Sequence, residues 1–190
     1  MCYAIIYFVR IYPHTKNLRE KWLRKPLLTL AYRHWLIDDT SLTALLQQRY
    51  EDFYVHALSQ LHTKPIKDEA ALLKLKSSMH VNVREVLLIG KGRPVVYAHS
   101  ILPDASLRGE WVKLGKLGNK PLGASLFNDP RVKRTPLSYK KLSYNHDLYQ
   151  KAVQYLDHPP LYLWARRSIF NLQCATILVT EVFLPNIQDE

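Results

Sequence analysis

Residues 80–103, HVNVREVLLIGKGRPVVYAHSILP, contain two runs of apolar and β-branched residues separated by the polar stretch 90–93. Two such runs joined by glycines predict an antiparallel β-hairpin. If residues 91–92 form its tip, Arg84 lies directly opposite His99 across the hairpin. Arg84 would then share a sheet face with apolar neighbours, which is an unusual position for a charge.

A second hairpin is predicted near the end of the chain. The run 161–172, LYLWARRSIFNL, and the run 177–185, ILVTEVFLP, are both typical of strands, and residues 173–176 would form the loop between them. A four-residue loop places Ser168 opposite Glu181. Because strand side chains alternate between faces, Glu181 also shares an apolar face. Burying a polar group without a hydrogen-bond partner costs about 2–7 kcal/mol. A buried Glu181 carboxylate therefore needs a partner.

Each hairpin therefore delivers one charged residue, Arg84 or Glu181, onto an apolar face. One interpretation is a buried ion pair between the two, which would leave neither available for a ligand. The other is a small enclosed pocket in which the arginine binds a carboxylate and the glutamate contacts a hydroxyl. The spacing in the sequence does not decide between them.

The N-terminal half contains helical patterns. Residues 16–37 are helical in pieces, and a helix start with Leu42 in its apolar stripe follows the capping residues 39–41. Residues 53–59, FYVHALS, fit either a helix or a strand. The prediction is one α+β domain over residues 1–190, mostly antiparallel. Residues 1–17 are either a first strand or a peripheral N-terminal extension.

Bulk composition narrows the classes of partner. The 190 residues include 27 Lys and Arg against 16 Asp and Glu, a net charge of +11, which favours anionic partners. The basic residues are scattered, which disfavours a nucleic-acid interface. The two cysteines, Cys2 and Cys174, lie far apart and indicate a reducing cytoplasm with neither a disulfide nor a metal site. The apolar stretch at the start is too short to cross a bilayer, so stable membrane insertion is not expected.

Three blocks together resemble the chorismate lyase family: residues 83–103, KLGNKPLGASLF at 116–127, and LWARRSIFNLQCATILVTEVFLP at 163–185. A fourth block, WLIDDTSLT at 35–43, resembles the family more weakly. The resemblance implies an antiparallel sheet with helices and helical flaps closing over an internal pocket. It also implies that residues 53–59 form a strand. It also implies a cytoplasmic, monomeric enzyme that converts chorismate to 4-hydroxybenzoate and pyruvate, the first step of ubiquinone biosynthesis, with no cofactor and no metal.

The resemblance also implies roles for individual residues. Arg84 matches the arginine that holds the ring carboxylate, and Glu181 matches the glutamate that contacts the ring hydroxyl; these two are the candidate catalytic residues. Leu122 of the PLG block and Leu42 of the N-terminal block would approach the substrate partly through backbone groups.

At His99 the chain departs from the family pattern, which has an arginine there. In the hairpin register above, His99 lies beside Arg84 and would bind the second carboxylate of chorismate. An imidazole carries at most one charge and only when protonated, so substrate affinity would depend on pH. Arg166 and Arg167 are alternative ligands for that carboxylate.

Two other functions fit parts of the sequence. The same fold type serves as a non-catalytic effector-binding domain in bacterial transcription regulators, so a small-molecule sensor of aromatic carboxylates is the main alternative. A basic nucleic-acid-binding protein is the third. Turnover of chorismate, binding without turnover, and salt-dependent binding to nucleic acid distinguish the three.

Overall fold

The computed structural model describes residues 21–27, 30–76 and 78–188. The expectation for residues 1–17, a first strand or a peripheral extension, therefore lies outside the described residues.

A seven-stranded antiparallel sheet forms the centre of the molecule and confirms the predicted α+β class. Strand order is β1-β2-β3-β7-β6-β4, and β5 also pairs with β6. Residues 53–59, ambiguous from periodicity, lie almost entirely in β1, as the family resemblance implies. The strands are β1 Tyr54–Thr63, β2 Val81–Gly90, β3 Arg93–Leu102, β4 Lys133–Arg134, β5 Ser138–Leu142, β6 Leu163–Leu172 and β7 Ala175–Phe183.

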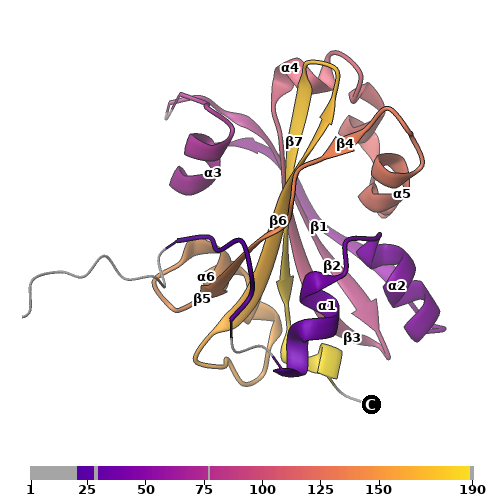
Figure 1. Ribbon diagram of the computed structural model, residues 1–190, viewed down its shortest axis with the longest axis vertical. Helices are drawn as coiled ribbons and strands as arrows, with labels where there is room; N and C mark the ends of the chain where they lie inside the picture. The colour runs from indigo at the N-terminus through magenta and orange to yellow at the C-terminus, as the bar shows by residue number, and fades with distance from the viewer. Residues whose placement is uncertain (1–20, 28–29, 77, 189–190) are drawn as a thin grey trace, which may run out of the picture.

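Short helices cover both faces of the sheet. Figure 1 shows α2 and α5 on one side of the strands and α3 and α6 on the other. No helix in the described part of the chain is long and apolar enough to cross a membrane. The α-helices are α1 Arg33–Ile37, α2 Leu42–Arg49, α3 Lys67–Leu72, α4 Asp104–Leu107, α5 Leu122–Phe127 and α6 Asp147–Ala152. The 3₁₀ turns are η2 Leu30–Tyr32, η3 Val112–Lys116, η4 Val153–Tyr155 and η5 Pro185–Gln188.

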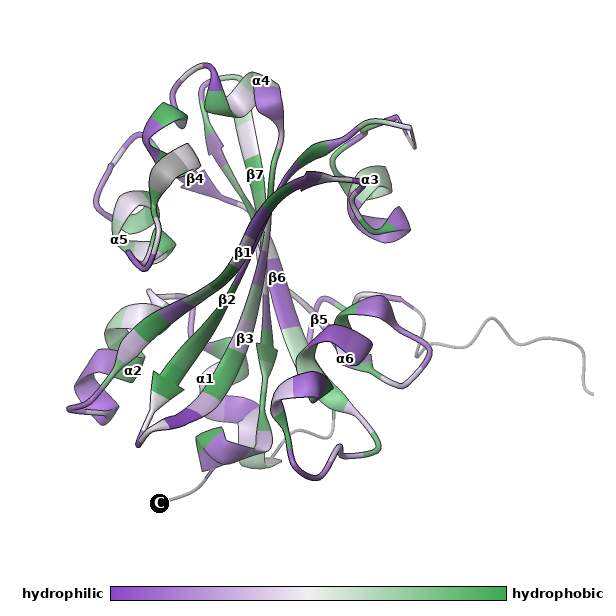
Figure 2. Ribbon diagram, turned by 180° about the vertical axis from the view of Figure 1, so that it is seen from behind, coloured by the Kyte–Doolittle hydropathy of each residue, from purple (hydrophilic) through white to green (hydrophobic). Residues whose placement is uncertain are grey.

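Because both faces are covered, the central strands β2, β3, β6 and β7 are largely buried and apolar on both sides. Val86, Leu88 and Trp164 belong to a core cluster on the α2 side, whereas Leu87 and Tyr97 belong to a cluster on the other side. Figure 2 shows hydrophobic residues along β2 and β3 and mostly hydrophilic residues on α6. A polar side chain in the middle of β2, β3, β6 or β7 is therefore largely buried on either face and needs a partner.

The register of the first hairpin differs from the prediction by one residue. At the tip Gly90 pairs with Arg93, as expected, but a β-bulge follows, because Leu88 pairs with Val96 and leaves Val95 as an extra residue. Beyond the bulge Arg84 pairs with Ser100, and His99 pairs with Glu85. The expected pairing of Arg84 with His99 is wrong for this reason.

The second hairpin has a tighter loop than expected. Only Gln173 and Cys174 lie between the strands, and Gln173 adopts the positive φ of 53° that a two-residue turn requires. Shortening the loop by two residues keeps each side chain on its predicted face but moves the register. Glu181 is consequently opposite Arg166, not Ser168.

Candidate active site

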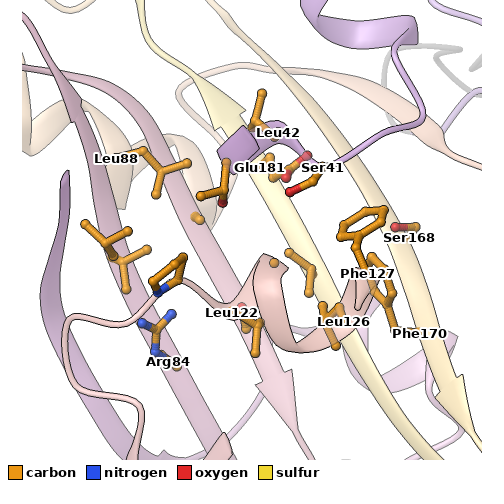
Figure 3. A pocket seen from close by; sticks show the side chains of 18 of the residues that line it. Ser41, Leu42, Arg84, Leu88, Leu122, Leu126, Phe127, Ser168, Phe170 and Glu181 are labelled. Carbon is orange, nitrogen blue, oxygen red and sulfur yellow. The ribbon is translucent and has the colours of Figure 1, made fainter. Parts of the chain in front are cut away.

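A pocket lies on the face of the sheet that α2 and α5 cover. Its walls are largely apolar, and strands β2, β3, β6 and β7 form its floor (Figure 3). Four of the five residues that the sequence singled out as ligand contacts line it: Leu42, Arg84, Leu122 and Glu181. The polar side chains on its surface are Ser41, Thr43, Arg84, Ser100, Arg134, Ser168 and Glu181.

Arg84 is a buried cation with no counterion among the described residues. Its side chain is 3% exposed, and Nη2 donates hydrogen bonds to the carbonyl oxygens of Gly118 at 3.1 Å and Lys120 at 3.0 Å. Burial lowers the pKa of this guanidinium. The two carbonyl oxygens fix the orientation of the Arg84 guanidinium without neutralising its charge. This end of the pocket therefore favours an anion.

Glu181 is paired, but with Arg166 and not with Arg84. The fully buried Arg166 donates from Nε to the Glu181 carboxylate at 2.5 Å and from Nη1 to the carbonyl oxygens of Trp35 and Asp38 at 2.7 and 2.5 Å. The ion pair between Arg84 and Glu181 that the sequence left open is therefore not formed. Arg166 therefore connects Glu181 to the C-terminal end of α1 through hydrogen bonds.

The floor between Arg84 and Glu181 consists of small side chains. Ala98 on β3 pairs with Glu181 on β7, and Ser100 on β3 pairs with Arg84 on β2. Arg84 and Glu181 are thus two strands apart and offset by one pair of residues, which separates their Cα atoms by about 12 Å. Ala98 and Ser100 both line the pocket between the two charges, and Figure 3 shows the side chains of Arg84 and Glu181 at this pocket.

Leu42 and Leu122 occupy equivalent positions in two helices. Each is the first residue of its helix, α2 or α5, and each is buried against the pocket. The first N–H groups of a helix lack intrahelical acceptors, so polar backbone groups lie near both leucines. Ser41 accepts a hydrogen bond from Ala44 at the start of α2.

His99 lies on the opposite face of the sheet, away from the pocket. The bulge in β3 turns its 2% exposed side chain toward Glu85, with Nδ1 to Oε1 at 3.2 Å, and toward Glu69, with Nε2 to Oε2 at 3.3 Å. The expectation that His99 contacts the substrate beside Arg84 is contradicted by this placement. Burial alone lowers the pKa of His99, but the two carboxylates outweigh it and raise the pKa to about 9.

This histidine makes protein stability depend on pH. In the unfolded chain its pKa is near 6.5, so between about pH 6.5 and 9 the folded state binds more protons. The free energy of unfolding should therefore decline across that range, by on the order of 1–3 kcal/mol. Urea unfolding at several pH values measures the decline. A curve that is flat from pH 6.5 to 9 would contradict a charged His99 in the folded protein.

Arg134 is a second cation on the pocket wall, and sequence reasoning missed it. It lies in the two-residue strand β4, where it pairs with Phe170, inside a polar segment with no periodic signal. Arg167, an alternative ligand in the sequence prediction, is on the other face, where it donates to Asp68 at 2.9 Å. Nothing in the sequence around Arg134 distinguishes it from the exposed Arg131 nearby.

Comparison with known proteins agrees with the resemblance seen in the sequence. Residues 19–190 match the family described as chorismate lyase. A probable chorismate pyruvate-lyase of Aromatoleum aromaticum is 45% identical over 184 residues, which cover 94% of this chain and 97% of that protein. A protein of the same description from Methylobacillus flagellatus is 43% identical over 170 residues, with 90% and 96% covered.

Solved structures with similar folds include an effector domain and a transcription regulator. The effector domain of PhnF from Mycobacterium smegmatis has a TM-score of 0.54 at 12% identity and covers 77% of this chain and 90% of that one. A GntR-family regulator from Bacillus cereus also has a TM-score of 0.54, at 15% identity, covering 71% and 93%. At these identities the likeness describes the fold alone.

Proposed function

The chain belongs to the chorismate lyase family, and from this premise we propose that it eliminates pyruvate from chorismate and releases 4-hydroxybenzoate. Chorismate carries a ring carboxylate, a hydroxyl on the opposite ring carbon, and an enolpyruvyl ether on the carbon next to the hydroxyl. Cleavage of the ether and loss of a ring proton make the ring aromatic. Aromatisation drives the reaction, which needs neither a cofactor nor a metal.

The observation that carries the proposal is the placement of Arg84 and Glu181 at either end of a floor made of Ala98 and Ser100. We assign the ring carboxylate to Arg84, whose planar fork suits a bidentate hold. The hydroxyl on the far side of the ring then lies at Glu181. Leu42 and Leu122 bound the ring from the starts of α2 and α5.

The protein's part in catalysis is to hold a reactive conformer with water excluded and to stabilise charge as the ether bond breaks. Glu181 accepts a hydrogen bond from the substrate hydroxyl and helps to move a proton during aromatisation. Arg166 keeps Glu181 oriented through their 2.5 Å contact, because its own side chain is fixed by backbone carbonyls.

The direct test is to incubate the protein with chorismate and measure 4-hydroxybenzoate and pyruvate. Equal amounts of both products, without added metal or cofactor, support the lyase. The alternative is a non-catalytic binding domain for aromatic carboxylates, because proteins with a similar fold include an effector domain and a GntR-family transcription regulator. Tight binding of 4-hydroxybenzoate with no turnover would select that alternative.

Replacing Glu181 with glutamine tests its role. We expect kcat to fall by about 10²–10⁴-fold, the usual range for a lost proton-transfer group, with a smaller change in KM. Steady-state kinetics from pH 6 to 8 measure this, and the exposed Glu51→Gln is the control. Full turnover of Glu181→Gln with an unchanged pH dependence would show that the role is wrong.

We propose further that the enzyme acts as a monomer in the cytoplasm and supplies 4-hydroxybenzoate to ubiquinone biosynthesis. Arg84, Glu181 and the pocket floor all come from one chain, which supports a monomeric enzyme. The free, exposed Cys174 suits a reducing compartment. Sedimentation at micromolar concentration tests the oligomeric state.

A further inference from the structure

The assignment of Arg84 to the ring carboxylate leaves the second carboxylate of chorismate without a ligand. His99 is on the other face of the sheet, and Arg166, which holds Glu181 and the end of α1, is not among the residues that line the pocket. Of the residues that line the described pocket, only Arg84 and Arg134 carry a positive charge.

Arg134 is held rigidly at the pocket wall. Its Nε donates to Ser168 Oγ at 2.8 Å, and its Nη1 donates to the carbonyl oxygen of Asp39 at 2.7 Å. The guanidinium carbon lies 5.3 Å from the ring centre of Phe127 and 5.2 Å from that of Phe170. Contacts on two nitrogens and with two rings fix the plane of the guanidinium before any ligand binds.

Arg134 also lies at the correct end of the pocket. Burial lowers the pKa of Arg134, attraction to Glu181 opposes that effect, and repulsion from Arg166 adds to it. Ser168, its hydrogen-bond partner, is two residues along β6 from Arg166, the partner of Glu181. In chorismate the enolpyruvyl ether is on the carbon next to the hydroxyl that we assign to Glu181. A cation near Glu181 is therefore in position to bind the enolpyruvyl carboxylate.

The charge of the site agrees with this placement. Glu181 is neutralised by Arg166, so Arg84 and Arg134 give the site two net positive charges. Chorismate carries two negative charges, whereas 4-hydroxybenzoate carries one. Resting on the proposed lyase function, we infer that Arg134 binds the enolpyruvyl carboxylate and thereby distinguishes the substrate from the aromatic product.

The test compares Arg134→Met with wild type in kcat/KM for chorismate and in Kd for 4-hydroxybenzoate. Loss of a charge-assisted contact should lower kcat/KM by about 10–100-fold. The Kd of 4-hydroxybenzoate, which lacks the second carboxylate, should change by less than about threefold. The control is Arg131→Met, in the same segment but with an exposed side chain paired to Asp129, and we expect it to match wild type.

The outcomes separate this inference from the proposed function. If wild type makes no 4-hydroxybenzoate from chorismate, the lyase function fails, whatever the variants do. If wild type is active and Arg134→Met is equally active, or weakens substrate and product binding to the same extent, Arg134 has no role specific to the enolpyruvyl carboxylate.

A second comparison applies where Arg134→Met fails to fold. Wild type and Arg134→Lys are compared for binding of 4-hydroxybenzoate and of its derivative with a carboxymethoxy group next to the hydroxyl. Wild type should bind the dicarboxylate more tightly than the monocarboxylate, and Arg134→Lys should lose most of that difference. An equal preference in both proteins would overturn the inference.

Discussion

Replacing Arg84 with methionine is expected to lower kcat/KM for chorismate by about 10²–10⁴-fold. The estimate follows from two charge-assisted hydrogen bonds to one carboxylate, each contributing about 1.5–3 kcal/mol. Binding of 4-hydroxybenzoate should weaken in parallel, because substrate and product share the ring carboxylate. Steady-state kinetics and a product-binding titration measure the two effects.

The matched control is Arg108→Met, which removes an exposed arginine after α4 without touching the pocket. It should have wild-type kinetics. Arg84 also donates to the carbonyls of Gly118 and Lys120, so melting temperature must be recorded for both variants. A folded Arg84→Met protein with product affinity unchanged would remove Arg84 from the carboxylate site.

Replacing His99 with leucine is expected to destabilise the fold without directly altering the pocket. The change leaves the 0% exposed Glu69 carboxylate without its cationic partner, and breaking a buried ion pair costs about 3–5 kcal/mol. For a chain of this size that corresponds to a fall in melting temperature of about 6–20 °C. Thermal unfolding followed by circular dichroism measures the fall.

His62→Leu is the control for this prediction. His62 pairs with Asp104 at 2.9 Å, but its side chain is 53% exposed, so its loss should cost less than about 1 kcal/mol. The kinetic readout also distinguishes the two placements of His99. If KM of His99→Leu rose strongly at unchanged melting temperature, His99 would belong to the substrate site and not to the far face.

Periodicity predicted the side-chain faces well where two strands alternate regularly. Arg84 shares its face with Val86 and Leu88 as expected, since these positions are separated by even steps along one strand. The bulge at Val95 could not be foreseen, because Val95 and Val96 are both β-branched and either register buries a valine. His99 was misplaced for that reason alone.

Residues positioned by tertiary contacts were beyond sequence reasoning. Arg134 belongs to a strand of two residues, which leaves no pattern to recognise. Glu69 lies in a short helix and becomes significant only because that helix packs on the far face against His99. Arg166 was noted as charged in a strand, but its link to Glu181 depends on the length of the loop.

The bulge at Val95 adds one unpaired residue to β3 and thereby reverses the face to which each later side chain of the strand points. Removing one residue between it and Ala98 would exchange the two sides of the strand and place the imidazole of His99 at the floor position that Ala98 now occupies beside Glu181. Changes in the length of this hairpin are therefore compatible with the pocket only in steps of two residues.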